Sequence, residues 1–213
     1  MNEDLLRFNK RQNYLVFDFE TCNLNLASSK NKPWQLGFMV VEKGRIKEKC
    51  DYWIKWPNLE MSEGARRITG WTERAYKEKG VDPIAPLDHF EKYLYDPSYL
   101  KIGHNILGFD VYIHNIYRQL CNRPPDYSYI PQCIDTLCLA KGIKKNIKLQ
   151  KGDNLLAWQY KLNSFFERGL RASLTQCCKD YQIDFDPKKL HDALYDIEKN
   201  YEVFTKMIWE IEI

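Results

Sequence analysis

The sequence predicts an α/β fold in which a mixed five-stranded sheet is flanked by helices. Three strand-like runs come first, and the later part of the chain alternates short strands with helical patterns. Strands that follow one another without a helix form an antiparallel meander, whereas strand–helix steps add parallel strands and cover the sheet. With 213 residues, 44% of them hydrophobic, the chain can bury one core and is short for two domains. We therefore expect a single domain over residues 1–213.

The first three strands are expected at residues 14–19, 34–42 and 45–54, because these runs are rich in β-branched and aromatic side chains. Lys43-Gly44 is the turn signal between the second and third strands. A fourth strand is expected to end at Gly103, and a fifth at 132–134. The first run is apolar without alternation, which is typical of a strand buried on both faces.

Helical patterns fall between and after the later strands. A short one is expected at 60–68, longer ones at 86–95 and 109–120, and another after residue 134. The last helix should start near Asp192, because apolar residues then recur at helical spacing. These residues are Leu194, Ile197, Tyr201, Phe204 and Ile208.

Two acidic residues, Asp18 and Glu20, interrupt the first strand near its carboxyl end. Residues two apart on a strand project to one face, so the two carboxylates should lie close together. Like charges held that close repel unless a proton or a cation lies between them, and hard divalent ions prefer carboxylate oxygens. The pair is therefore a candidate metal site. The alternative is a strand end turned toward solvent.

Three more polar residues extend this candidate site. Asp110 falls in the first turn of the expected helix 109–120, where an acid also interacts well with the helix dipole. His191 and Asp196 are five residues apart, which separates side chains by about 140° on a helix. His191 should therefore precede the last helix, in a position suited to a mobile general base.

Three ordered motifs give the chain a family resemblance. Asp18-Phe-Glu20-Thr21 matches the first motif of the DEDD superfamily of 3′–5′ exonucleases, His104 through Asp110 the second, and His191 through Asp196 the third. The spacing in the third motif resembles that of the histidine subtype. Weaker matches are Gln35-Leu-Gly37, Ile68-Thr-Gly-Trp-Thr72 and Ile134-Asp-Thr-Leu137. The resemblance implies a ribonuclease H-like fold.

The resemblance also implies a mechanism and a substrate class. Asp18 would bridge two Mg²⁺ or Mn²⁺ ions, with Glu20 and Asp196 at one ion and Asp110 at the other. His191 would take a proton from the attacking water. The product would be a nucleoside 5′-monophosphate released from a 3′ end. Thr21 is expected to contact the terminal nucleotide, and His104 and Asn105 to shape the loop of the second motif and bind substrate.

Single-stranded DNA is the favoured substrate. RNA or short oligonucleotides stay open as the alternative, because motifs do not report how a 2′-hydroxyl is sensed. Two other function classes stay open. One is an inactive nucleic-acid-binding module that kept the fold, which the complete set of five catalytic residues disfavours. The other is an exonuclease subunit whose main role is docking to a polymerase or another nucleic-acid machine.

Residues 141–171 stand apart as a basic insert that contains aromatic side chains. Eight basic residues against two acidic ones give this segment a charge of +6, whereas the whole chain carries +3. Lys144, Lys145 and Lys148 are candidates for contacts with phosphates, and Trp158 and Tyr160 for stacking on unpaired bases. In the alternative, the aromatic residues form the core of a small helical insert and the lysines are a solvated face.

The remaining composition indicates an intracellular protein. No run of about 18 apolar residues exists to span a membrane, so no membrane association is expected. The seven cysteines form no pair of Cys-x2-Cys motifs, and none has a histidine at zinc spacing. Reduced, mostly structural thiols are therefore expected rather than a zinc site, which suits a cytoplasmic location.

Overall fold

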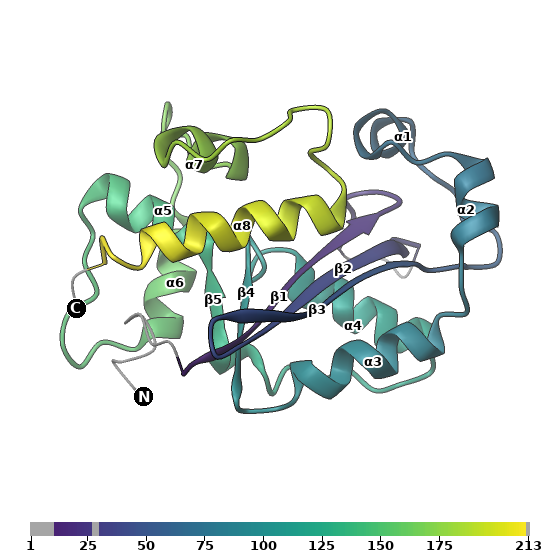
Figure 1. Ribbon diagram of the computed structural model, residues 1–213, viewed down its shortest axis with the longest axis horizontal. Coiled ribbons are helices and arrows are strands. Elements are labelled where there is room, and N and C mark those ends of the chain that lie inside the picture. Colours follow the sequence, from purple (N-terminus) through teal and green to yellow (C-terminus); the bar gives the residue numbers. More distant parts are fainter. Residues whose placement is uncertain (1–10, 27–29, 212–213) are drawn as a thin grey trace.

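A five-stranded mixed sheet forms the centre of the protein, as the sequence predicts (Figure 1). The computed structural model describes residues 11–26 and 30–211, so both ends of the expected domain lie outside it. The strand order is β3-β2-β1-β4-β5; β1 to β3 are antiparallel, and β4 and β5 run parallel to β1. The strands are β1 (Asn13–Thr21), β2 (Pro33–Glu42), β3 (Arg45–Trp53), β4 (Tyr99–Gly103) and β5 (Cys133–Asp135).

Each predicted helix is present within a few residues of its expected bounds. The described helices are α1 (Glu63–Thr69), α2 (Glu73–Lys79), α3 (Ile84–Leu94), α4 (Asp110–Leu120), α5 (Thr136–Lys145), α6 (Leu155–Ser164), α7 (Leu174–Asp180) and α8 (Ala193–Met207). The sequence does not predict α2 and α7. Both have seven residues, as does α1, so an apolar period spans fewer than two turns and gives only a weak signal.

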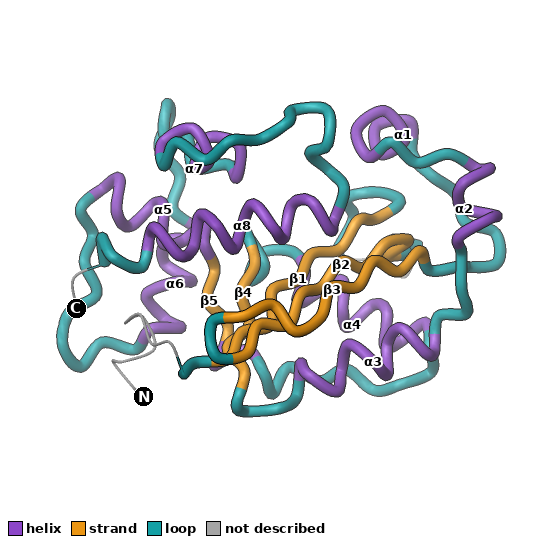
Figure 2. The backbone as a smooth tube through the Cα atoms, viewed as in Figure 1, coloured by secondary structure: helices purple, strands orange, loops and turns teal. Residues whose placement is uncertain are grey.

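The sheet lies between two layers of helices. Figure 2 shows α8 across one face and α3 with α4 on the other. Along β1, Tyr14 and Val16 pack into the core on the α8 side, whereas Leu15, Phe17 and Phe19 pack into the core on the opposite side. This double burial explains why the sequence of β1 shows no polar alternation before Asp18.

Two predictions about solvent and redox environment can be compared with the structure. No helix in residues 11–26 and 30–211 is long and apolar enough to cross a membrane. All seven cysteines are free in the structure, and five of them are buried. Cys50 and Cys121 are the two that stay partly accessible.

Candidate active site

Carboxylates from three distant chain segments meet at the carboxyl end of β1. Asp18 and Glu20 are the last acidic residues of that strand, Asp110 is the first residue of α4, and Asp196 lies in the first turn of α8. The pocket at this place has a volume of about 230 Å³. Its lining comprises Asp18, His104, Ser173, Leu174, Thr175, Leu190, His191, Asp196, Ile197 and Asn200.

A glycine lets α8 approach the sheet beside Asp18. Gly37 on β2 is paired with Asp18 in the antiparallel register. A Cβ atom at Gly37 would lie 2.7 Å from the carbonyl carbon of Ala193, the first residue of α8, and this distance is too short for any side chain. Because Gly37 has no side chain, the first turn of α8 can pack directly against β2. Asp196, in that turn, then lies near the carboxylate of Asp18.

Asp110 is held by the backbone of β1. The β4 strand pairs with β1 only as far as Val16 and ends at Gly103, so the β4-facing edge of β1 has no strand partner beyond that point. The N–H of Phe19 donates to Asp110 Oδ1 across this gap, at 2.9 Å. Because Phe19 lies between Asp18 and Glu20, the bond places the third carboxylate next to the first two.

The carboxylates crowd one another in a buried place. Burial, together with the negative charges of Asp196 and Asp192, raises the pKa of Asp18 to about 8. Burial also raises the pKa of Asp196 to about 7. For Glu20 and Asp110, burial and the charge of Asp18 raise the pKa well above the ordinary value. In all four groups burial is the main cause of the raised pKa, and the neighbouring negative charges add to it.

This donor set fits divalent metal ions. All four groups offer hard carboxylate oxygens, which Mg²⁺ and Mn²⁺ prefer. Asp196 Oδ1 is buried and has no hydrogen-bond partner within the described residues, whereas Asp196 Oδ2 accepts the N–H of His191 at 3.1 Å. An oxygen that is buried without a donor is costly, and a metal ion would satisfy it.

His191 precedes α8, as its spacing from Asp196 predicts. The residue lies in a turn two positions before the helix and has a left-handed backbone with φ of 68°. Such a conformation is uncommon outside glycine and is found at functional sites. A ring nitrogen of His191 lies within 4.8 Å of carboxylate oxygens of both Glu20 and Asp196. Burial lowers the pKa of the imidazole below 6.5, which favours the neutral form that can accept a proton.

Asp135 organises the loop between β4 and α4. Its Oδ1 accepts the N–H of Asn105 at 2.8 Å, and its Oδ2 accepts the N–H of Leu107 at 3.1 Å. Oδ1 also caps α5 through the N–H of Leu137. Sequence reasoning singled out the segment around Asp135 without assigning it this part. The available signal was a charged residue at the end of a buried strand.

The other residues expected at the second motif contact the protein itself. His104 lines the pocket, and its Nδ1 is 3.0 Å from Thr136 Oγ1; burial lowers its pKa to about 4, so it stays neutral. The side-chain oxygen of Asn105 accepts a hydrogen bond from Asn163 on α6. Both residues thus shape the loop, and their contact with substrate stays a prediction.

Thr21 ends β1 with a buried side chain. Its hydroxyl donates to the carbonyl of Asn23 and is therefore already used within the chain. A contact between Thr21 and a nucleotide stays a prediction.

The three lysines of the basic insert do not line the carboxylate pocket. Lys144 Nζ pairs with Asp180 Oδ2 at 2.5 Å, and Lys145 Nζ with Glu167 Oε2 at 2.8 Å. Lys148 lines a separate small pocket near the carboxyl terminus of the described chain. Figure 1 shows α5 beside the carboxyl half of α8, away from the first turn that carries Asp196. For these lysines the structure favours the alternative interpretation, in which they form a solvated surface and do not contact the substrate.

The expectation that Trp158 stacks on bases is wrong for this structure. Its side chain is 8% exposed and belongs to the core beneath α8, against Gly142 of α5. The cause is the packing of α6 against α5, which buries the face of α6 that carries Leu155, Trp158, Gln159 and Leu162, as in the alternative of a small helical insert. Tyr160 is on the same helix and is 37% exposed, so a role for Tyr160 in substrate contact stays a prediction.

A second, larger groove of about 650 Å³ adjoins the carboxylate pocket and shares His191 with it. The groove lies between the last turn of α1, the start of β2, the end of β3 and the start of α8. Three exposed basic residues, Arg67, Lys188 and Lys189, line it, together with the acidic Asp192 and Glu198. Sequence reasoning missed these cations, although Lys188-Lys189 stands just before His191.

Comparison of the sequence with known families gives one match over most of the chain. The sequence profile of the family RNase_T, described as Exonuclease, matches residues 15–204. No curated protein sequence matches the chain significantly.

Solved structures with the same fold include those of exonuclease I. The zinc-bound form of the E. coli exonuclease I complex with single-stranded DNA superposes with a TM-score of 0.69 at 17% identity, covering 92% of this chain and 40% of that one. The E. coli complex with a dA16 oligonucleotide gives 0.67 at 18% identity, with the same coverage. The apo structure of exonuclease I gives 0.69 at 17%, covering 95% and 43%. This chain thus spans about two fifths of the exonuclease I chains, and it shares their ribonuclease H-like fold.

Proposed function

The chain belongs to the RNase_T family of exonucleases within the DEDD superfamily, and we propose that it removes nucleotides from the 3′ end of single-stranded DNA. The observation that carries the proposal is the convergence of Asp18, Glu20, Asp110 and Asp196 with His191 at the carboxyl end of β1, beside the pocket that Asp18, His191 and Asp196 line. The histidine subtype is part of the proposal, supported by the position of His191 before α8. Single-stranded DNA is favoured because exonuclease I structures of the same fold hold such strands.

The four carboxylates would hold two divalent ions, Mg²⁺ or Mn²⁺. When bound, such ions polarise the scissile phosphate, lower the pKa of a water molecule and stabilise the leaving oxygen. Asp18 is central among the acids, because its charge contributes to the raised pKa values of both Glu20 and Asp110. Asp196 contributes the buried Oδ1 that has no other partner among the described residues.

His191 would accept the proton of the attacking water. It is exposed, lies on the turn before α8 and reaches the same space as Glu20 and Asp196. Its lowered pKa keeps the imidazole neutral at physiological pH. Since the backbone N–H of His191 is bonded to Asp196, the base and one metal-binding acid are positioned by a single turn.

The strand would approach through the groove next to the pocket. A cluster of carboxylates repels the phosphate backbone, and neighbouring cations offset that repulsion. Arg67, Lys188 and Lys189 lie on the groove walls on either side of the path to His191. The proposal therefore assigns the substrate-attracting charge to α1 and to the 187–190 turn, rather than to the basic insert.

End-labelled strands test both the polarity and the substrate. A single-stranded DNA labelled at its 5′ end should shorten progressively with Mg²⁺ or Mn²⁺, and the labelled mononucleotide should appear last. The same strand labelled at its 3′ end should release labelled nucleoside 5′-monophosphate at once. Early release of the 5′ label, or internal cuts, would contradict the proposal. A matched RNA strand degraded faster than the DNA would assign the enzyme to RNA instead.

A further inference from the structure

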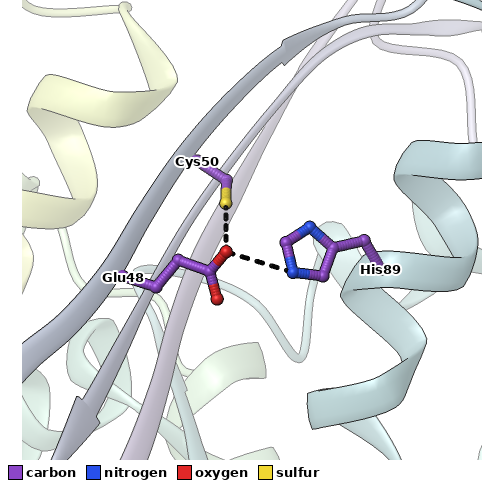
Figure 3. Close-up of side chains that lie close together, drawn as sticks. All are labelled: Glu48, Cys50 and His89. Carbon is purple, nitrogen blue, oxygen red and sulfur yellow. Dashed lines mark hydrogen bonds and ion pairs between the residues drawn. The ribbon is translucent and has the colours of Figure 1, made fainter.

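A glutamate, a cysteine and a histidine meet on the face of the sheet opposite α8. Glu48 and Cys50 are two residues apart on β3 and therefore project to the same side, where His89 of α3 packs over them (Figure 3). Cys50 Sγ is 3.5 Å from Glu48 Oε1, and His89 Nε2 is 3.1 Å from the same oxygen. One ligand atom from each residue lies within 4.8 Å of the other two.

These spacings suit a single tetrahedral ion. Zinc binds sulfur at about 2.3 Å and imidazole nitrogen or carboxylate oxygen at about 2.0–2.2 Å, so its ligand atoms lie roughly 3.3–3.7 Å apart. Two of the three separations in the cluster are already close to this range, and the third needs a closure of about 1 Å from its upper limit of 4.8 Å. The mixture of thiolate, imidazole and carboxylate is typical of zinc rather than magnesium.

The outer atoms of the ligands are already fixed by two tyrosines. His89 Nδ1 is 2.9 Å from the hydroxyl of Tyr52, and Glu48 Oε2 accepts the hydroxyl of Tyr93 at 2.9 Å. Each residue thus keeps one atom, Nε2 or Oε1, directed into the cluster. Outer hydrogen bonds of this kind orient the ligands of metal sites and set the tautomer of a ligating histidine.

We propose that Glu48, Cys50 and His89 bind one Zn²⁺ ion at a site separate from the nuclease carboxylates. The ion would replace the hydrogens that now converge on Glu48 Oε1. Cys50 would bind as a thiolate after its proton passes to solvent, and His89 would bind through Nε2 while its proton resides on Nδ1, next to Tyr52. The side chains of Glu48 and His89 are 29% and 28% exposed, which leaves an entry path and room for a water as fourth ligand.

Such an ion would join the edge strand to the helix layer. β3 is an outer strand of the sheet and its neighbour in the strand order is β2. A zinc ion bound by β3 and α3 would hold this edge against the helix. Burial and the charge of Glu48 raise the pKa of the Cys50 thiol to about 12, so the thiol is protonated until a metal displaces the proton.

Cobalt in place of zinc tests the site directly, because thiolate ligation to Co²⁺ gives a charge-transfer absorption that carboxylates do not give. The full chain carrying Asp18→Asn, which weakens metal binding at the carboxylate pocket, is titrated with Co²⁺. The proposal predicts one equivalent that develops the thiolate band and is displaced by one equivalent of Zn²⁺. Cys50→Ser should abolish the band, and His89→Gln should weaken Co²⁺ binding at least about tenfold.

Cys121→Ser is the matched control, because Cys121 is the other partly accessible cysteine. It should keep the band at full intensity. Cys50→Ser and His89→Gln should keep the far-UV circular dichroism spectrum of the parent chain, which shows that they fold. Absence of the thiolate band in the parent chain, or its persistence in Cys50→Ser, would overturn the proposal. Neither result bears on the exonuclease activity, so the two proposals fail separately.

Discussion

The backbone N–H of Phe19 donates a 2.9 Å hydrogen bond to the carboxylate of Asp110, which is 91 residues further along the chain. This bond joins the end of the central strand to the first residue of α4. It forms where β4 has ended, so an unpaired backbone group of β1 finds its partner in a side chain of the active site. The same bond therefore completes the sheet edge and positions an acid of the proposed metal centre.

Crowding of the carboxylates should make the metal-free protein less stable at alkaline pH. The pKa of Asp18 is raised to about 8 and that of Asp196 to about 7, above the unfolded value near 3.9. Groups with a raised pKa stabilise the fold below the unfolded value, and this stabilisation is lost as the pH rises through 7–8. Asp18→Asn should therefore stabilise the metal-free protein by about 1–2 kcal/mol at high pH, and little at low pH.

Thermal unfolding in chelator at about pH 5 and about pH 9 measures this effect. The wild-type protein should lose more Tm between the two than Asp18→Asn does, and Mg²⁺ should restore the wild-type Tm at the higher pH. Parallel pH profiles for the two proteins would show that Asp18 has no raised pKa.

Removing the imidazole of His191 should lower the cleavage rate by about 10²–10⁴-fold, because a positioned base is lost while the carboxylates stay. The neutral form acts as base, and burial lowers its pKa, so the wild-type rate should rise with pH through a value below 6.5. His191→Ala should flatten that rise. The check is single-turnover cleavage from pH 5 to 8 at saturating Mn²⁺. An unchanged profile would assign the proton to another acceptor.

Gly37→Ala should damage the active site from a distance. Its Cβ would meet the backbone of Ala193 at 2.7 Å, so the first turn of α8 must move away from β1. Overpacking of this kind costs about 1–3 kcal/mol, and a displaced Asp196 should lower activity further. Denaturant unfolding and cleavage rates measure both effects. Gly64→Ala on α1 is the control, because no atom lies within 4 Å of its added Cβ; equal behaviour of the two variants would contradict the packing argument.

Neutralising Arg67, Lys188 and Lys189 with glutamine should weaken strand binding and its salt dependence. For a single strand, removing one cation that pairs with a phosphate should reduce the log–log slope by roughly 0.7. The matched triple change at Lys144, Lys145 and Lys148 should have a smaller effect, because two of these lysines are paired with acids. Binding by a catalytically impaired chain at several salt concentrations separates the two sets. If the changes at Lys144, Lys145 and Lys148 weaken binding more than those at Arg67, Lys188 and Lys189, the basic insert, and not the groove, contacts the strand.

Local pattern predicts most of the fold and singles out the acidic residues that meet at the end of β1. β1 and α8 are recognisable because each presents a long apolar period, and Asp18, Glu20 and Asp196 interrupt those periods at defined positions. The position of His191 follows from helix geometry alone. These features depend on neighbours within one element, which the sequence displays directly.

Features that depend on contacts between elements are not visible in the sequence. The inward face of Trp158 is determined by its packing against Gly142 on another helix, and the basic charge around it carries no such information. Cys50 and His89 meet because α3 crosses β3. Their spacing in the sequence matches no zinc motif, so the sequence gives no sign of this contact. The sequence predicts only that Asp135 follows a strand. Its hydrogen bonds to the 104–109 loop are visible only in the structure.

The most direct test of the central claim compares two identical changes four residues apart. Asp196→Asn removes a carboxylate from the proposed metal centre, whereas Asp192→Asn keeps the cap of α8, because asparagine caps helices as well as aspartate. Mg²⁺-dependent release of 3′-terminal mononucleotide is measured for both variants and the wild-type chain. We predict that Asp196→Asn loses at least about 10²-fold in rate and Asp192→Asn less than about tenfold. Wild-type turnover in Asp196→Asn would contradict the assignment of these carboxylates as the site of hydrolysis.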